Sequence, residues 1–371
     1  MHNSDREHDA WNAFSKRLAS ARLAKNIPCD SIVLDIEGQQ LPVTLNLEGR
    51  ADTSWVASLR NAYGPYAREE SSRLLKGWLA RYGGELSAWL GESILMAAGL
   101  SGGLYLNNWI VSTNLHQIEF NARIILQAKE RLRNKYPGVP LVIRSLMIEH
   151  HRELITELVD AGFVLLPTRQ VWLMDTLSNG RYRKRTDVKN DLKLEHHSDA
   201  PHQWTTSDTF SEEDWLRVLR LYRWLYLEKY PDFNPDYDLA FILEGVDTGW
   251  LDVQGLRHPS GHLDGVLGTI RRPGWMSCPL FGYALDAPIT QGLYRRLTTK
   301  AFEIGEREGR IMHCSGGAGR FKQTRGAYQT IEYAACFLAD RSTSRLQTLL
   351  LKATSAALHK WAIPYLKKHS L

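Results

Sequence analysis

A run of small residues followed by a lysine, at positions 315–322, carries the residue types best suited to chemistry. It reads Ser-Gly-Gly-Ala-Gly-Arg-Phe-Lys and is expected between the end of a strand and the start of a helix. Small residues let the backbone approach a ligand closely, and free amides at a helix start favour an anion or a developing oxyanion. We therefore predict a loop that stabilises negative charge, formed by Ser315, Gly316, Gly317 and Gly319, with Lys322 adding positive charge one turn later.

Two common phosphate-binding motifs do not fit this run. The Walker loop requires GxxxxGK[ST], but no glycine precedes Lys322 and Gln323 follows it. The dinucleotide motif GxGxxG fails because Lys322 stands where the last glycine is required. The alternative interpretation is a tight turn without a ligand.

The elements around this loop follow an order that occurs twice in the sequence. In the second half, a helix (291–308) stopped by Gly309 is followed by a strand (311–314), a short helix (320–325), Gly326 and a strand (331–338). The first half repeats the order with a helix at 117–136, a strand at 141–144, a helix at 151–160, Gly162 and a strand at 171–174. This order predicts a duplicated unit in which helices flank a central sheet.

Turn signals and alternating apolar residues predict the remaining architecture. Three strands at 250–256, 263–270 and 276–284 form an expected antiparallel meander, and residues 30–47 read as two short strands. A helix at 212–229 carries an aromatic face, which favours core packing. With 371 residues, we predict an α+β (layered α/β) fold with a lead-in at 1–45 and two domains at 46–178 and 179–371, the second carrying the site.

Residues 263–338 carry a resemblance to a known family. The strand 265–270, the pair Gly282-Tyr283, the helix start at 292–294, the loop 315–322 and the triplet 325–327 resemble the C-terminal half of the FemAB-like branch of the GNAT acyltransferase superfamily. The resemblance implies two GNAT-like halves, each with a mixed sheet flanked by helices. It also implies transfer of an acyl or aminoacyl group to an amine of a small molecule or peptide, without a covalent enzyme intermediate.

The same resemblance implies the co-substrate and the site residues. No cofactor is expected to stay bound, and the donor is acyl-CoA or aminoacyl-tRNA. The loop 286–293 departs from the [QR]xxGx[GA] pattern of acetyl-CoA-dependent relatives, which weakens a simple CoA assignment. We predict catalytic roles for Lys322, Tyr283 and Asp286, and donor binding by the loop together with Arg325, Gln291 and Gly292. A catalytically silent binding protein on the same scaffold is the alternative from another class.

Several other groups of residues also have residue types that could do chemistry, and most have plainer interpretations. We expect Cys314 to be a buried thiol that His313 does not activate, because neighbours in a strand face opposite sides. The pairs at 150–151 and 196–197 are histidines without zinc-like partners, so no metal site is predicted. Glu332 could polarise an amine or be an exposed strand carboxylate. Lys322→Ala is expected to depress turnover and leave the fold intact.

Charge and composition bound the partners. The formal net charge of +5 and pI near 8.9 favour anionic ligands without naming one. The basic run at 181–185, with Lys189 and Lys193, is either a solvated helix face or a surface for the backbone of tRNA. The four scattered cysteines suggest reduced thiols. No secretory signal or membrane-spanning apolar stretch is apparent, so a soluble cytoplasmic protein with no membrane partner is expected.

Overall fold

The computed structural model describes residues 3–74, 77–117, 119–195, 202–229, 233–338 and 344–368. The chain forms two compact units, each built from separate segments of the sequence. Unit 1 comprises Met1–Phe14, Val171–Tyr230 and Asp236–Gln329. Unit 2 comprises Ser15–Gln170, Pro231–Pro235 and Thr330–Leu371. Since compactness does not define ancestral domain boundaries, the predicted domain ranges stay a prediction.

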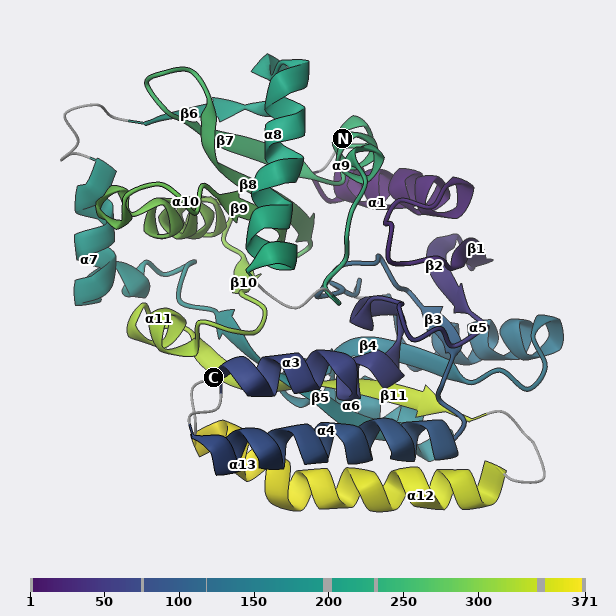
Figure 1. The fold of residues 1–371 in the computed structure, drawn as a ribbon. Helices are drawn as coiled ribbons and strands as arrows, with labels where there is room; N and C mark the ends of the chain where they lie inside the picture. Colours follow the sequence, from purple (N-terminus) through teal and green to yellow (C-terminus); the bar gives the residue numbers. More distant parts are fainter. Residues whose placement is uncertain are drawn as a thin grey trace. The chain divides into compact units, whose positions relative to one another are not determined.

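Unit 1 contains a mixed sheet in the order β5-β10-β9-β8-β7-β6 (Figure 1). Its strands are the end of β5 (Val164–Met174), β10 (Ile311–His313), β9 (Trp275–Tyr283), β8 (Leu263–Arg272), β7 (Asp252–Arg257) and β6 (Gln203–Thr206). The predicted meander β7-β8-β9 is confirmed as antiparallel, whereas β10 runs parallel to β9. The helices of unit 1 are α7 (Thr186–Leu192), α8 (Glu212–Arg223), α9 (Leu239–Asp247), α10 (Leu293–Arg307) and α11 (Gly319–Thr324), with the start of α1 (Asn3–Ser20).

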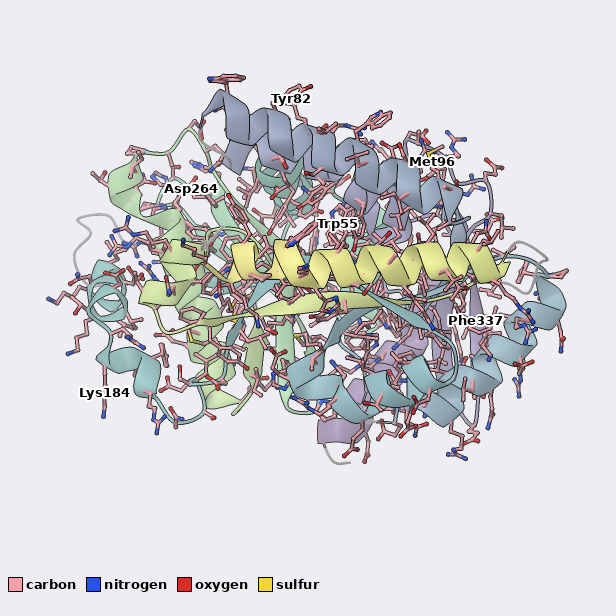
Figure 2. All side chains as sticks on the ribbon, turned by 90° about the horizontal axis from the view of Figure 1, so that it is seen from below. Trp55, Tyr82, Met96, Lys184, Asp264 and Phe337 are labelled. Atoms are coloured by element: carbon pink, nitrogen blue, oxygen red, sulfur yellow. The ribbon has the colours of Figure 1, made fainter. Side chains whose placement is uncertain are left out.

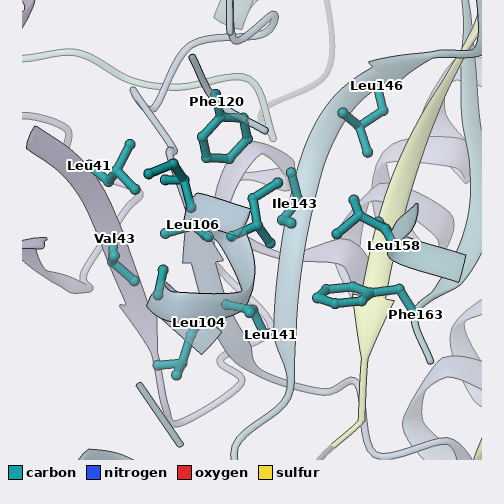
Figure 3. Packing of buried hydrophobic residues seen from close by; sticks show 14 of the residues in the cluster. Leu41, Val43, Leu104, Leu106, Phe120, Leu141, Ile143, Leu146, Leu158 and Phe163 are labelled. Carbon is teal, nitrogen blue, oxygen red and sulfur yellow. The ribbon is translucent and has the colours of Figure 1, made fainter. Parts of the chain in front are cut away.

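Unit 2 contains the order β1-β2-β3-β4-β11-β5. Its strands are β1 (Asp30–Ile36), β2 (Gln39–Asn46), β3 (Gly103–Leu106), β4 (Leu141–Met147), β11 (Tyr328–Phe337) and the first part of β5. Its helices are α2 (Leu59–Tyr63), α3 (Pro65–Leu74), α4 (Trp78–Ala97), α5 (Ala122–Lys135), α6 (Ile148–Asp160), α12 (Ser344–Ala357) and α13 (Ile363–Lys368). Figure 3 shows the core, where Leu104, Leu106 and Ile143 of the sheet meet Leu158 and Phe163.

The predicted repeat of element order is confirmed. The series α5, β4, α6, Gly162 and β5 recurs as α10, β10, α11, Gly326 and β11. In each series the first strand runs parallel to a neighbour, β4 to β3 and β10 to β9. Each unit also takes a strand from the other repeat, because β5 ends against β10 while β11 pairs with β4. The predicted α+β fold class, with a mixed sheet flanked by helices in each unit, is confirmed.

Several predicted elements differ in extent from the structure: the strand predicted at 171–174 begins at Val164, and the helix predicted at 117–136 spans Ala122–Lys135. The apolar stretch after Gly103 gives a strand that ends at Leu106, because Asn107 adopts a left-handed backbone (φ 52°) that turns the chain. The helix predicted at 212–229 is α-helical to Arg223 and then forms a π-helical turn, Trp224–Glu228. The π turn lies against β9, next to the predicted site.

Candidate functional site

The loop that follows β10 adopts an unusual backbone. Ser315, Gly317 and Ala318 all have positive φ, at 58°, 70° and 49°. Two of these residues carry a side chain, so the conformation costs energy and persists only where neighbouring contacts hold it. β5 supplies such contacts, because Trp172 donates its amide to Ser315 O at 3.1 Å and accepts the amide of Cys314 at 2.8 Å.

Lys322 holds the same loop from the other side. Its ammonium group donates to the carbonyl oxygens of Cys314 (2.6 Å), Gly316 (2.8 Å) and Ser315 (3.3 Å). In a trans peptide the N–H of the next residue points away from the carbonyl, and no cis peptide bond occurs among the described residues, which include this loop. The amides of Gly316 and Gly317 therefore point away from the ammonium. Gly316 is half-buried and Gly317 is exposed, so the loop displays two backbone donors.

Lys322 itself is buried, with 8% of its surface exposed. The side chain therefore lies in the packed interior, contrary to the reason for expecting Lys322→Ala to leave the fold intact, and that outcome stays a prediction. The ammonium therefore stabilises the conformation of the loop through charge-assisted hydrogen bonds to three carbonyls. By fixing these peptide groups, it also fixes the direction of the amides that a ligand would meet.

His313 and Cys314 each bond to the backbone, as expected for a pair in which the histidine does not activate the thiol. His313 is buried and its Nδ1 accepts the amide of Ser315 at 3.1 Å. The thiol of Cys314 donates to Met312 O at 3.7 Å. Burial raises the pKa of Cys314 to about 11, although the charge of Lys322 acts to lower it. Cys314 is half-buried and not fully buried as predicted, and its protonated thiol is a poor nucleophile at neutral pH.

Arg325 is engaged by a carboxylate that sequence analysis missed. Its Nε and Nη2 donate to Asp191 Oδ2 (2.6 Å) and Oδ1 (3.1 Å), and its guanidinium lies 3.4 Å from the ring centroid of Phe321. Asp191 on α7 is buried and also accepts from Arg295 Nε on α10 at 2.5 Å. Asp191 thus ties α7 to α10 and α11. Donor binding by Arg325 stays a prediction, and a donor phosphate would share this guanidinium with Asp191.

The basic run at 181–193 has one part that packs against Glu306 and another part that is exposed. Tyr182 is buried and its hydroxyl donates to Glu306 Oε2 at 2.9 Å, so its ring is not available for base stacking. Arg183 also binds Glu306, which lowers the pKa of that carboxyl. The other cations in the run are exposed, namely Arg181, Lys184, Arg185, Lys189 and Lys193. These five form an exposed basic surface on η2 (Arg181–Lys184), α7 and the residues joined to it.

Tyr283, at the end of β9, is connected to α11, the helix that carries Lys322, by contacts between aromatic rings. Its ring centroid lies 5.9 Å from that of Tyr294, and the ring of Tyr294 lies 4.7 Å from that of Phe321. Lys229, which sequence analysis did not single out, donates its ammonium to the Tyr283 hydroxyl at 3.3 Å. Lys229 follows the π-helical turn of α8, a feature that residue patterns do not reveal.

A glycine permits this arrangement of α8 and β9. A Cβ atom at Gly282 would lie 2.6 Å from the backbone C and O atoms of Leu221 on α8. Only glycine therefore lets α8 lie directly on the strand that presents Tyr283.

The loop between β9 and α10 contains the other predicted residues. Asp286 is exposed. Gly292 adopts φ 61° and precedes α10 without a side-chain cap, and the first turn of that helix has no acidic residue. A Cβ at Gly292 would meet Leu194 Cδ1 at 2.7 Å, so residues after α7 cover this corner. Gln291 Oε1 is buried and has no hydrogen-bond partner among the residues that the structure describes. Donor binding by Gln291 and Gly292 stays a prediction.

Glu332 and the histidine pairs lie apart from this group. Glu332 in unit 2 is buried and accepts from Arg169 Nε at 2.5 Å, so the interpretation as an exposed strand carboxylate is wrong. His151 Nδ1 accepts the amide of Met147 at 3.0 Å, whereas residues 196–197 lie outside the described residues. Within the described ranges, no cluster of three or more His, Cys, Asp or Glu residues has the geometry for a metal ion.

Comparisons with known proteins find relatives by structure alone. No protein-family model matches the sequence, and no curated protein matches it. One solved structure, the C-terminal domain of a "Putative Lysylphosphatidylglycerol Synthetase" from Agrobacterium fabrum, matches with a TM-score of 0.50 at 10% identity, covering 94% of this chain and 96% of that chain.

Two further solved structures match more weakly. FemX gives a TM-score of 0.48 at 8% identity over 61% of this chain and 78% of its own. L-PGS from Bacillus licheniformis gives 0.45 at 15% identity over 62% of this chain and 77% of its own. The likeness to the Agrobacterium fabrum domain extends over nearly the whole of both chains. At these identities the likeness concerns the fold and not the reaction.

None of the helices in the described ranges is both long enough and apolar enough to span a membrane.

Proposed function

We propose that this chain is an acyltransferase that moves an acyl or aminoacyl group onto an amine of a small-molecule or peptide acceptor. The observation that carries the proposal is the loop held by Lys322, in which three carbonyls turn inward and the amides of Gly316 and Gly317 turn outward. Two adjacent amides that point away from the ammonium suit the negative charge that develops on a carbonyl oxygen under attack. A fold like that of a domain named for a putative lysylphosphatidylglycerol synthetase is consistent with this chemistry.

The remaining residues take roles in the same direct transfer. The acceptor amine must be neutral to attack. Asp286 is proposed to take the proton that it loses, and the Tyr283 hydroxyl is proposed to give a proton to the leaving sulfur or ribose oxygen. Lys229, which donates to Tyr283, places a positive charge beside that hydroxyl. Gln291 and Gly292 at the start of α10, together with Arg325, are proposed to hold the donor. The nitrogen–carbonyl bond forms as the bond to the donor's sulfur or ribose oxygen breaks, so no covalent enzyme intermediate and no resident cofactor are needed.

The exposed cations of residues 181–193 favour aminoacyl-tRNA over acyl-CoA as the donor. A phosphate backbone is recognised by such sequence-independent charge, and the degenerate 286–293 loop lacks the pattern suited to the pyrophosphate of CoA. Reversal of these charges, as in Lys184→Glu with Lys189→Glu and Lys193→Glu, is expected to raise KM for a tRNA donor and to leave KM for an acyl-CoA donor unchanged.

The test is an assay of the purified protein with labelled aminoacyl-tRNAs or acyl-CoAs. The acceptors are candidate amines and peptides. Phosphatidylglycerol, whose hydroxyl would receive the group as an ester, is added as a comparison because a protein of like fold is named for its lysyl derivative. Product that disappears after ribonuclease treatment selects the tRNA donor. Saturable donor binding without product from any acceptor would select the alternative, a catalytically silent binding protein.

Two variants connect an observed activity to the site. Tyr283→Phe removes the hydroxyl that Lys229 contacts and is expected to lower kcat. Lys25→Met is a matched control, because Lys25 is exposed in unit 2 and lies outside the proposed site. Equal kcat for Tyr283→Phe and the native protein would remove Tyr283 from the proton transfer.

A further inference from the structure

Helix α4 exposes a stripe of large apolar side chains. Trp78, Tyr82, Leu86 and Trp89 follow one another at spacings of four, four and three residues, so they lie on one helix face. Their exposed fractions are 75%, 65%, 46% and 58%. Figure 2 shows Tyr82 projecting from the outer side of the helix. Isolated exposed apolar residues are ordinary, but a continuous stripe marks an interaction surface.

The opposite face of α4 anchors it to unit 2. Ala88 and Leu95 are buried, and Glu92 pairs with Arg60 and Arg68 at 2.9 Å and 2.7 Å. Gly91 packs against the ring of Tyr63. The helix is therefore held in place while its aromatic stripe stays exposed.

The C-terminal helices continue this exposed surface. Gln347 on α12 donates to Ala97 O at the end of α4 at 3.3 Å, and Leu351 shares a core cluster with Leu95. Figures 1 and 2 show α12 beside α4. The segment 344–368 exposes further large apolar side chains, namely Leu346, Leu349, Trp361 and Tyr365.

The same segment is strongly and uniformly basic. Residues 344–368 contain no Asp or Glu, and they carry five exposed cations, Arg345, Lys352, Lys360, Lys367 and Lys368. The formal charge of this segment is +5, which equals the formal net charge of the entire chain. The remaining residues therefore balance to zero. The aromatic stripe thus has a cationic neighbour.

We propose that α4 and the segment 344–368, together called the docking face, bind this protein to the surface of a membrane that contains anionic lipids. Trp and Tyr rings suit the level of the lipid headgroups, where one side of the ring is apolar and the other is wet. Lysines and arginines beside them attract anionic headgroups. The expectation of no membrane partner rested on the lack of a spanning segment, and docking on a surface needs none.

Charge distinguishes this occupant from a second copy of the chain. A two-fold dimer through the docking face would bring the same five-cation segment of each copy to one interface. Like charges at an interface oppose association, whereas an anionic bilayer complements them. The proposal does not depend on transferase activity, and its test measures binding alone.

The test uses the full-length protein and vesicles of phosphatidylcholine with or without phosphatidylglycerol. The protein is expected to co-sediment with the mixed vesicles, less so as salt concentration rises, and its tryptophan emission is expected to shift to shorter wavelength. Equal sedimentation with phosphatidylcholine alone, or none with either, would overturn the proposal.

Two sets of variants locate the contact. Trp78→Gln combined with Tyr82→Gln and Trp89→Gln, or Lys360→Glu with Lys367→Glu and Lys368→Glu, is expected to weaken vesicle binding about tenfold or more. Matched controls change exposed residues elsewhere, Val159→Gln with Leu216→Gln and Lys16→Glu with Lys25→Glu and Arg152→Glu, and should bind as the native protein does. Thermal unfolding confirms that each variant is folded. A dimer in sedimentation velocity that the aromatic variant abolishes would assign the face to a second copy and refute lipid docking.

Discussion

Lys322 donates to three backbone carbonyls of the loop before its helix, so removal of the ammonium leaves those carbonyls beside a buried apolar chain. We expect Lys322→Met, which keeps the length of the side chain, to lower the free energy of unfolding by about 1–3 kcal/mol. Turnover should fall further than the loss of folded protein explains, because the amides of Gly316 and Gly317 lose their orientation. Urea denaturation and initial rates measure the two effects, with Lys25→Met as control. Unchanged stability would show that the carbonyls do not depend on the lysine.

Asp191 on α7 accepts hydrogen bonds from Arg295 on α10 and from Arg325, the residue that directly follows α11. Asp191→Asn removes the negative charge between two guanidinium groups, one of which is almost fully buried. We expect a loss of about 3–5 kcal/mol in the free energy of unfolding, as for other broken buried pairs.

Asp187→Asn provides the matched control for this prediction. Asp187 also lies on α7 and approaches Arg325 at 3.6 Å, but 44% of its side chain is exposed. Its replacement should therefore cost about 1 kcal/mol or less. If the two variants unfold at the same urea concentration, the ion pairs of Asp191 with Arg295 and Arg325 do not stabilise the fold more than the exposed Asp187 does.

At the scale of elements, the start of α8 combines a capping box with an ion pair. Ser211 and Asp214 exchange side-chain and backbone hydrogen bonds, and Arg257 on β7 binds both oxygens of Asp214 at 3.0 Å and 2.8 Å. The hydrogen bonds from Arg257 lower the pKa of Asp214 below its ordinary value. A carboxyl with a depressed pKa in the folded state contributes stability above its unfolded pKa, and loses it as the pH falls through its folded pKa.

We therefore expect Asp214→Ala to reduce the free energy of unfolding at neutral pH by about 1–2 kcal/mol. The difference from the native protein should shrink below about pH 4, where unfolded aspartates become protonated. Urea denaturation at neutral and acidic pH measures this. A difference that stays constant across the range would mean that the charge of Asp214 contributes nothing.

Residue patterns predicted elements well where the signal is local. The meander β7-β8-β9 was predictable because turn residues separate alternating strands, and the repeat was predictable because helix stops and glycines recur in order. The backbone supports the repeat further, since Ser145 in β4 and Ser315 after β10 both have positive φ.

The same patterns failed where the structure depends on distant partners. Asp191 lies in a basic run, and nothing in that run indicates two arginines more than a hundred positions away. The role of Lys229 depends on a π-helical turn that shifts the end of α8. For the loop at 315–319, the small residues predicted backbone amides that could meet a ligand. They did not predict that Lys322 donates hydrogen bonds to the carbonyl oxygens of the same loop.

At the scale of the whole molecule, each unit is completed by a strand from the other repeat. In unit 1 the last residues of β5 pair with β10, and in unit 2 most of β11 pairs with β4. The pairing of such strands depends on contacts between residues far apart in the sequence, which local patterns do not encode. A unit that loses the exchanged strand exposes backbone donors and acceptors along an open edge. This connectivity predicts that the two units unfold together.

The four cysteines can test that prediction, because they divide equally between the units. Cys29 and Cys336 lie in unit 2, and burial raises their pKa values to about 11 and about 12. Cys278 and Cys314 lie in unit 1, where burial likewise raises the pKa of each thiol. Native thiols should therefore react slowly with a thiolate-selective reagent at mildly alkaline pH. Pulsed alkylation across a urea series, read by mass spectrometry of each peptide, is expected to give one midpoint for all four. Two midpoints, one for each pair, would show that exchange of β5 and β11 does not couple the units.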